Sequence, residues 1–153
     1  MNRNNQKIKK NFICIIPARS KSKGIKNKNI RIVGGKPLIY WTIKEALKCK
    51  YFSKVIVSTD SLRIKRISEK YGAECPFLRN KKLSGDRTSS VEVIQHMLNQ
   101  LDKKNKKNSN DQIVLLQPTS PLRTLHDIKK SIKVFNLKKN NESSLINVNE
   151  IED

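Results

Sequence analysis

Short apolar runs recur along the chain, separated by polar segments that contain turn residues. The clearest run is FICII at residues 12–16, which ends at Pro17. It is too short to span a membrane, and its β-branched residues suit a strand buried on both faces. Residues 54–60 (KVIVSTD) and 112–116 (QIVLL) have the same character. The pattern therefore predicts three buried strands, and a weaker strand over residues 73–78, which Pro76 would place near a sheet edge.

Between these runs, apolar residues recur at the spacing of an amphipathic helix. This predicts a helix over residues 38–49, a second that stops at Gly72, a third that Ser89 begins and a fourth after Thr124. The residues that mark these helices are Leu38, Ile39, Thr42, Ile43, Ala46, Leu47, Ile64, Ile67, Tyr71, Val91, Ile94, Met97, Leu98, Leu101, Ile128, Ile132, Phe135 and Leu137.

Local signals between the elements support these boundaries. Ser89 with Glu92, and Thr124 with Asp127, have the spacing of helix-capping pairs. Residues 34–37 (GGKP) predict a turn before the first helix, residues 102–111 a solvated connection, and residues 144–148 the start of one more strand. The alternation of strand and helix predicts an α/β fold: a Rossmann-like three-layer arrangement with a mostly parallel sheet and helices on both faces.

Composition limits the possible classes of protein. The 153 residues suffice for one domain, and residues 1–11 are expected to form a disordered basic lead-in. A net charge of +20 raises the alternative of a nucleic-acid-binding domain, but the lysines are spread along the chain and only 5% of residues are aromatic. The three cysteines lack metal-site spacing, which favours a reducing cytoplasm, and Cys14 and Cys49 are expected in the core.

The first strand leads into a basic loop. This loop carries one glycine, Gly24, and five cations: Arg19, Lys21, Lys23, Lys26 and Lys28. Such cations can neutralise phosphate charge, and a residue without a Cβ lets backbone N–H groups approach oxygen atoms. The spacing matches neither the Walker A motif nor GxGxxG. The loop therefore indicates a phosphate site of another kind, although a solvated basic surface is the alternative.

Parallel strands present their carboxyl ends to one edge of a sheet, where ligands bind. Residues 19–29, 58–60 and 117–123 should meet there, with residues 79–90 nearby. Asp60 is interpreted as the cap of the helix that follows it, and Ser89 as a structural cap. His96 and His126 sit in or beside helical patterns without a partner for a catalytic or metal site.

Four segments, in this order, resemble the CMP-sialic acid synthetases (acylneuraminate cytidylyltransferases), including their legionaminate and pseudaminate relatives. They are PARSKSKGIKNKNI, VIVSTD, the spacing from Arg79 to DRTSS, and LLQPTSPLR. The resemblance covers residue 12 to the end of the chain. It implies a nucleotidyltransferase that transfers CMP from CTP to the anomeric hydroxyl of a nine-carbon 2-keto sugar acid and releases pyrophosphate.

The resemblance also implies roles for individual residues. Arg19 and Lys23 would act on the leaving pyrophosphate, helped by N–H groups around Ser22 and Gly24. Gln117 would hold the acidic sugar. The residues implied to contact the nucleotide are Arg19, Ser22, Lys23, Gly24, Asn29, Arg79, Thr88 and Ser90. Many relatives have proline at the position of Lys26 or Asn27, so this chain departs from the family in its basic loop.

Members of that family are longer than this chain. We therefore expect residues 12–153 to be the N-terminal part of a cytidylyltransferase domain, and the chain alone to bind CTP weakly and to lack turnover. In the family, Mg²⁺ ligands, sugar-pocket residues and the segment exchanged in a homodimer lie beyond this part, so no metal ligand is predicted in this chain. Sialic, legionaminic and pseudaminic acid stay open as substrates, and KDO or a sugar 1-phosphate is the alternative.

Overall fold

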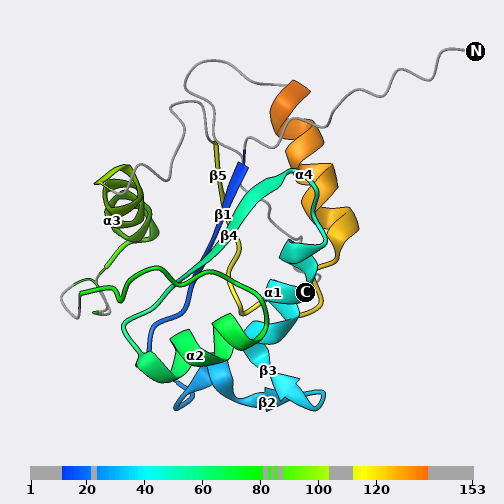
Figure 1. The fold of residues 1–153 in the computed structure, drawn as a ribbon. Coiled ribbons are helices and arrows are strands. Elements are labelled where there is room, and N and C mark those ends of the chain that lie inside the picture. The colour runs from blue at the N-terminus through cyan, green and yellow to red at the C-terminus, as the bar shows by residue number, and fades with distance from the viewer. Residues whose placement is uncertain are drawn as a thin grey trace, which may run out of the picture.

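A parallel three-stranded sheet forms the centre of the molecule in the computed structural model, which describes residues 12–21, 24–80, 83, 85, 88–103 and 112–137 (Figure 1). The strands are β1 (Phe12–Pro17), β4 (Phe52–Ser58) and β5 (Gln112–Leu115), in the order β4-β1-β5. β1 pairs in parallel with both neighbours, in a register that joins Cys14 to Val55 and to Val114. The predicted parallel sheet is confirmed.

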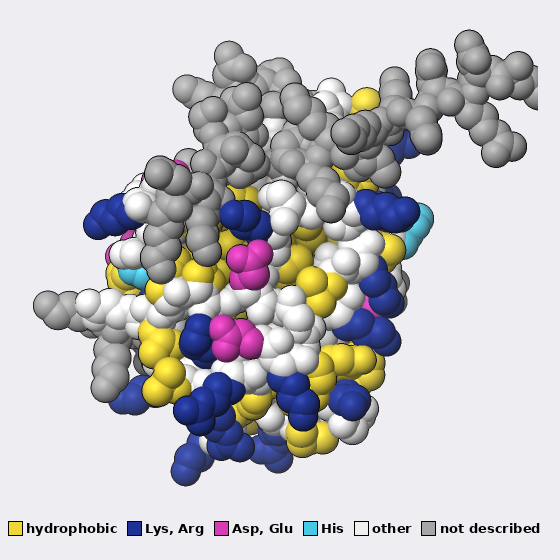
Figure 2. All heavy atoms as spheres, in the orientation of Figure 1, with side chains coloured by type: hydrophobic (Ala, Val, Ile, Leu, Met, Phe, Trp, Pro, Cys, Tyr) yellow, Lys and Arg dark blue, Asp and Glu magenta, His cyan; other side chains and the backbone are white. Residues whose placement is uncertain are grey.

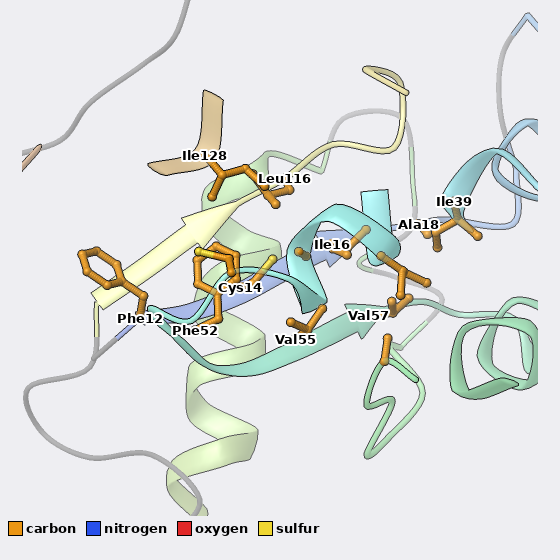
Figure 3. Packing of buried hydrophobic residues seen from close by; sticks show 14 of the residues in the cluster. Phe12, Cys14, Ile16, Ala18, Ile39, Phe52, Val55, Val57, Leu116 and Ile128 are labelled. Carbon is orange, nitrogen blue, oxygen red and sulfur yellow. The ribbon is translucent and has the colours of Figure 1, made fainter. Parts of the chain in front are cut away.

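The side chains of β1 alternate between the two faces of the sheet. Ile13 and Ile15 pack with Met97 and Leu101 of α3 (Ser90–Lys103). On the other face, Phe12, Cys14 and Ile16 belong to a larger cluster with residues of α1 (Leu38–Leu47), α2 (Leu62–Lys70) and α4 (Leu125–Leu137), part of which Figure 3 shows. Helices therefore cover both faces, as predicted, because β1 is apolar at every position from 12 to 16.

A short irregular section links β1 to α1. It contains one turn of 3₁₀-helix, η1 (Lys28–Ile30), and the antiparallel pair β2 (Ile32–Val33) and β3 (Lys36–Pro37). Gly34 and Gly35 connect β2 to β3 with φ angles of 58° and 76°. Two successive positive φ angles suit a tight hairpin turn, and glycine adopts them without steric cost. The predicted turn is thus present, and the two short strands beside it were not predicted.

The predicted strand over residues 73–78 is wrong. Glu74 forms a single parallel bridge with Ile56 of β4, through hydrogen bonds with the backbone of Val55 and Val57. The predicted place beside the sheet is correct, but no strand develops there. Pro76 lacks the N–H that a longer ladder would need.

Three residues expected on buried helix faces are exposed: Leu47 by 48%, Val91 by 71% and Leu137 by 76%. Leu47 and Leu137 are the last residues of α1 and α4, and Val91 lies in the first turn of α3. The buried residues of α3 are Val93, Met97 and Leu101. The prediction of Met97 and Leu101 is confirmed, and Val93 takes the place expected for Val91.

All three cysteines are buried and carry free thiols, so the expectation that Cys14 and Cys49 are core residues is confirmed. Burial raises the pKa of each thiol, to about 11 for Cys75. Among the helices that the structure describes, none is long and apolar enough to cross a membrane. The predictions for residues 1–11 and 144–148, and for most of 102–111, lie outside the described residues.

Candidate functional site

A hollow of about 200 Å³ lies near the carboxyl ends of the strands. Its lining includes six residues that the sequence had suggested as nucleotide or substrate contacts: Arg19, Asn29, Arg79, Thr88, Ser90 and Gln117. The other lining residues are Pro17, Lys28, Leu83, Gly85, Ser89, Val93, Pro118 and Thr119. The expected meeting of residues 19–29, 79–90 and 117–123 is therefore observed, whereas residues 58–60 do not line the hollow. The chemical roles of the lining residues stay predictions.

The loop after β1 is tied to its surroundings at Arg19. The Nδ2 of Asn29 donates to the Arg19 carbonyl oxygen at 3.0 Å, and Asn29 is buried in η1. Arg19 Nη1 donates to the carbonyl oxygen of Gly85 at 3.2 Å. Asn29 thus supports the loop, while Lys28, beside it, lines the hollow as a second cation.

Asn27 has a left-handed backbone. It is one of the two positions, with Lys26, at which the resemblance implied proline. Its φ and ψ are 57° and 31°, and it precedes the first residue of η1. Asparagine tolerates this conformation, whereas the proline ring fixes φ near −65°. A proline at position 27 would therefore not fit this backbone.

The interpretation of Asp60 as a helix cap is wrong. Ser61 is the N-cap of α2, because its hydroxyl accepts a hydrogen bond from the backbone N–H of Ile64. Asp60 instead binds Ser20 in the loop after β1. Its Oδ1 accepts from the Ser20 N–H at 2.8 Å, and its Oδ2 accepts from the Ser20 hydroxyl at 2.6 Å.

Arg79 lies at the buried side of the hollow, with only 5% of its surface exposed. Its backbone N–H donates to the carbonyl oxygen of Thr59 at 2.7 Å, which fixes it beside the end of β4. Burial lowers the pKa of Arg79, the negative charge of Asp60 raises it, and the positive charge of Arg19 lowers it. Two guanidinium groups thus act on one another in this hollow, an arrangement that a bound anion would stabilise.

His96, for which no catalytic role was predicted, packs edge-to-face against Phe77 with ring centroids 5.9 Å apart. Burial lowers the pKa of His96, and the charge of Arg79 lowers it further. Both effects favour the neutral form of the ring, and His96 does not line the hollow.

The start of α3 forms another wall of the hollow. Glu92 accepts hydrogen bonds from the N–H and the hydroxyl of Ser89, and the Ser89 hydroxyl accepts from the Glu92 N–H. The predicted structural cap at Ser89 is confirmed. Ser90, the first residue of α3, is exposed on the lining, and Thr88 is half-buried there. A helix N-terminus presents backbone N–H groups and a partial positive charge, which suits an anionic ligand.

The loop after β5 contributes Gln117, whose side chain is accessible. Its Oε1 accepts from the Thr119 hydroxyl at 3.3 Å, and its carbonyl oxygen accepts from Arg123 Nη1 at 3.3 Å. The predicted cap at Thr124 and Asp127 is confirmed: the Asp127 carboxylate accepts from the N–H and the hydroxyl of Thr124. Anchored at both ends, the loop holds Gln117 at the hollow.

Some predicted site residues are not among those that line the hollow. Ser22 and Lys23 lie outside the described residues. Gly24 is exposed, is not part of the lining, and has open space where a Cβ would stand. Conversely, Lys28 and Thr119 line the hollow and were not predicted as site residues. Lys28 had been noted only as one of five loop cations, and Thr119 only as part of residues 117–123, which were expected at this edge of the sheet.

A metal site does not emerge from the residues that the structure describes. Within them, no group of three His, Cys, Asp or Glu side chains is placed to hold an ion. Asp60, the carboxylate beside the hollow, uses both oxygens to bind Ser20. The described residues therefore do not fit a protein-bound Mg²⁺ ion.

The distribution of charge bears on the nucleic-acid alternative. On the face that Figure 2 shows, Lys and Arg side chains gather at the lower edge and recur on the right-hand side and in the upper part, with apolar, neutral and acidic side chains between these groups. Nucleic-acid binding predicts a long basic stripe, and this face does not present one in its described part.

Comparisons with known proteins identify the family. A family model described as "Cytidylyltransferase" matches residues 13–152. The chain is 43% identical over 124 residues to an N-acylneuraminate cytidylyltransferase from Escherichia coli O18:K1:H7, covering 81% of this chain and 28% of that protein. It is 40% identical over 123 residues to a pseudaminic acid cytidylyltransferase from Campylobacter jejuni, covering 80% of this chain and 52% of that protein.

A solved structure supports the fold. The CMP:2-keto-3-deoxy-manno-octonic acid synthetase complexed with CTP superposes with a TM-score of 0.68 at 20% identity, covering 83% of this chain and 48% of that one. The chain thus spans about half, or less, of the proteins it matches. Because the family model matches nearly all of the residues after position 12, the chain belongs to the cytidylyltransferase family.

Proposed function

We propose that this chain supplies the nucleotide-binding part of an enzyme that transfers CMP from CTP to a nine-carbon 2-keto sugar acid. One observation carries the proposal. Arg19, Arg79 and Gln117, from three segments far apart in sequence, line one hollow at the end of a parallel sheet. The names of the relatives, which include N-acylneuraminate and pseudaminic acid cytidylyltransferases, support CTP and an acidic sugar as the substrates.

In the proposed reaction, the anomeric oxygen of the sugar acid attacks the α-phosphorus of CTP. A bond forms between this oxygen and phosphorus, the bond from phosphorus to the bridging oxygen of the β-phosphate breaks, and pyrophosphate leaves with that oxygen. The hydroxyl proton passes to solvent. Such a step needs little covalent work from the protein, so the rate depends on alignment and on neutralising phosphate charge.

The candidate residues divide into three roles in this proposal. Arg19 and Lys28 neutralise charge on the phosphates, with Lys23 and the N–H groups near Ser22 and Gly24 completing the loop. Arg79, Thr88 and Ser90 hold the nucleotide, and Asn29 fixes the loop through the Arg19 carbonyl oxygen. Gln117 hydrogen-bonds the sugar acid.

The remaining parts of the proposal concern the whole protein. Mg²⁺ is expected to accompany the triphosphate, as in the family, with ligands other than the described residues. A homodimer and a cytoplasmic location are proposed as well; the three free cysteines support a reducing compartment.

Two experiments test the function. The first measures binding of CTP, UTP and ATP to this chain by isothermal titration calorimetry. Preference for CTP is expected, and equal affinity for all three would contradict a cytidylyltransferase site. The second measures pyrophosphate release by the complete gene product with sialic, pseudaminic and legionaminic acid, KDO and a sugar 1-phosphate. Turnover of the sugar 1-phosphate alone would overturn the proposed substrate class.

Nucleic-acid binding is measured as a test of the alternative function. A filter-binding titration with duplex and single-stranded nucleic acid at physiological salt is expected to show no submicromolar affinity. Submicromolar binding whose logarithm falls steeply with the logarithm of the salt concentration would instead support the basic-surface alternative.

A further inference from the structure

We propose that Asp60 is a positioning residue of the nucleotide site: it fixes the loop after β1 so that Arg19 faces the phosphates of CTP. The inference rests on the proposed function. It begins with the two hydrogen bonds from Ser20 to Asp60, at 2.8 Å from the N–H and 2.6 Å from the hydroxyl. These bonds join the carboxyl ends of β1 and β4, across 40 positions of sequence.

Asp60 is available for this contact because its neighbours cap the helix. Ser61 caps α2, and the Ser61 N–H donates to the Thr59 hydroxyl at 3.1 Å. The hydrogen bonds at the turn from β4 into α2 thus form without the Asp60 carboxylate. A carboxylate that accepts an N–H and an O–H bond at these lengths forms charge-assisted hydrogen bonds, which are stronger than neutral ones.

The contact between Asp60 and Ser20 restricts the backbone at Arg19, because Arg19 and Ser20 are adjacent in sequence. Ser20 is held by Asp60, and the carbonyl oxygen of the preceding residue, Arg19, accepts from Asn29 Nδ2 at 3.0 Å. Two successive residues of the loop are therefore fixed by side chains from other segments. Between them, these bonds set the direction in which the Arg19 side chain leaves the backbone.

Asp60 also balances charge at the hollow. Arg79 is buried, its pKa is lowered by that burial and by the charge of Arg19, and Asp60 is the group that favours its charged form. The backbone N–H of Arg79 donates to Thr59, the residue before Asp60. One carboxylate therefore lies between the loop that carries Arg19 and the segment that carries Arg79.

A plain electrostatic reading of Asp60 makes the opposite prediction. If Asp60 were only a negative charge near an anion site, its removal would tighten CTP binding, because repulsion between the carboxylate and the phosphates would be lost. If Asp60 positions Arg19, its removal weakens CTP binding. The sign of the change separates the two readings.

The experiment compares the affinities of this chain for CTP and CMP by ligand-observed NMR. CMP lacks the pyrophosphate that Arg19 is proposed to face, so the ratio of the two affinities reports on loop position. Asp60→Ala is expected to lower CTP affinity by about tenfold and CMP affinity by less than about twofold. Asp60→Asn is expected to stay within about threefold of wild type for CTP, because its amide still accepts from the Ser20 N–H.

Asp127→Ala is the matched control. Asp127 makes the same pair of bonds with Thr124, an N–H and a hydroxyl to one carboxylate, and does not line the hollow. It is expected to lower the melting temperature and leave the CTP-to-CMP ratio unchanged. Ser20→Ala, which keeps the N–H bond, is the milder variant should Asp60→Ala fail to fold, and its ratio is expected to fall by about threefold.

Each result has one meaning. The inference is overturned if the ratio of CTP affinity to CMP affinity in Asp60→Ala equals or exceeds the wild-type ratio. If Asp60→Ala does not fold, the same test applies to Ser20→Ala. Either result leaves the proposed function standing. An equal fall of the ratio in Asp127→Ala would also overturn the inference, because the effect would then be general destabilisation. A wild-type chain that does not prefer CTP to CMP would overturn the proposed function and the inference together.

Discussion

The carboxylate of Glu45 in α1 accepts a hydrogen bond of 3.0 Å from the backbone N–H of Leu125, the first residue of α4. The same carboxylate forms an ion pair with Lys48 at 2.6 Å. α1 therefore helps to fix the point at which the loop that carries Gln117 ends. A side chain from one helix satisfies an N–H at the start of another, where the helix itself has no acceptor.

This contact predicts a measurable loss of stability. Glu45→Ala is expected to lower the free energy of unfolding by about 1 kcal/mol, because the Leu125 N–H loses its acceptor. Glu45→Gln keeps an oxygen at the same position and should lose less. Urea denaturation followed by circular dichroism measures both, with Lys48→Met as the control for the ion pair. Equal losses in Glu45→Ala and Lys48→Met would attribute the effect to the ion pair.

The cap of α2 gives a second prediction. Ser61→Ala is expected to cost about 1 kcal/mol of stability, whereas Ser61→Asp should be close to neutral, because aspartate is an equally good N-cap. Thermal unfolding of the two variants distinguishes them. If alanine were tolerated at position 61, the assignment of the cap to Ser61 would be wrong.

The hairpin between β2 and β3 offers a matched pair of glycines. A Cβ at Gly34 would lie 3.1 Å from Cζ2 of Trp41, whereas a Cβ at Gly35 would have open space, and both residues have positive φ. Each alanine variant is expected to lose about 1 kcal/mol through backbone strain, and Gly34→Ala more, through contact with the indole. Denaturant titration of the pair tests the difference. Equal stability of the two variants would show that the indole moves aside freely.

Stability should fall in acid partly through Asp127. Hydrogen bonds from the N–H and the hydroxyl of Thr124 lower the pKa of this carboxyl in the folded chain. In the unfolded chain this carboxyl has the ordinary aspartate pKa of about 4, so the unfolded chain binds its proton first as the pH falls. The stabilisation of the folded chain by the ionised carboxylate is therefore fully present above about pH 4 and is lost as the pH falls through the lower folded pKa. The free energy of unfolding between pH 6 and pH 3 should fall less steeply in Asp127→Asn. An identical slope in both proteins would contradict this.

Arg19→Ala tests the proposed chemistry in the complete gene product. Removal of one charge-stabilising donor is expected to lower kcat by about a hundredfold, with the fold intact. Arg31→Ala is the control, since Arg31 is an exposed arginine that follows η1 and does not line the hollow. A loss below about fivefold in Arg19→Ala would remove this residue from the transition state.

Much of the fold was predictable because its signals are local. Residues 12–16 are apolar at every position, which is typical of a strand covered on both faces, and β1 proved to be the central strand. The capping pair at Ser89 and Glu92 was equally clear, since both hydrogen bonds join residues three positions apart.

Long-range partners were not predictable in the same way. Asp60 and Ser61 are adjacent, and either side chain can cap a helix, so the choice depended on Ser20, which is distant in sequence. At the start of α3 the choice between Val91 and Val93 was not predictable, because both are apolar and only the folded structure shows that Val93 is buried and Val91 is exposed. Lys28 was one of several loop cations until η1 placed it at the hollow.

The register between β1 and β5 has a consequence for the order of folding. β1 pairs Phe12 with Gln112, so the central strand gains its second neighbour only after most of the described chain has been synthesised. Contacts between segments so far apart in sequence close large loops and form slowly. On the ribosome, the pairing of β1 with β4 can therefore precede the arrival of Gln117, and the hollow is complete only after Gln117 has emerged.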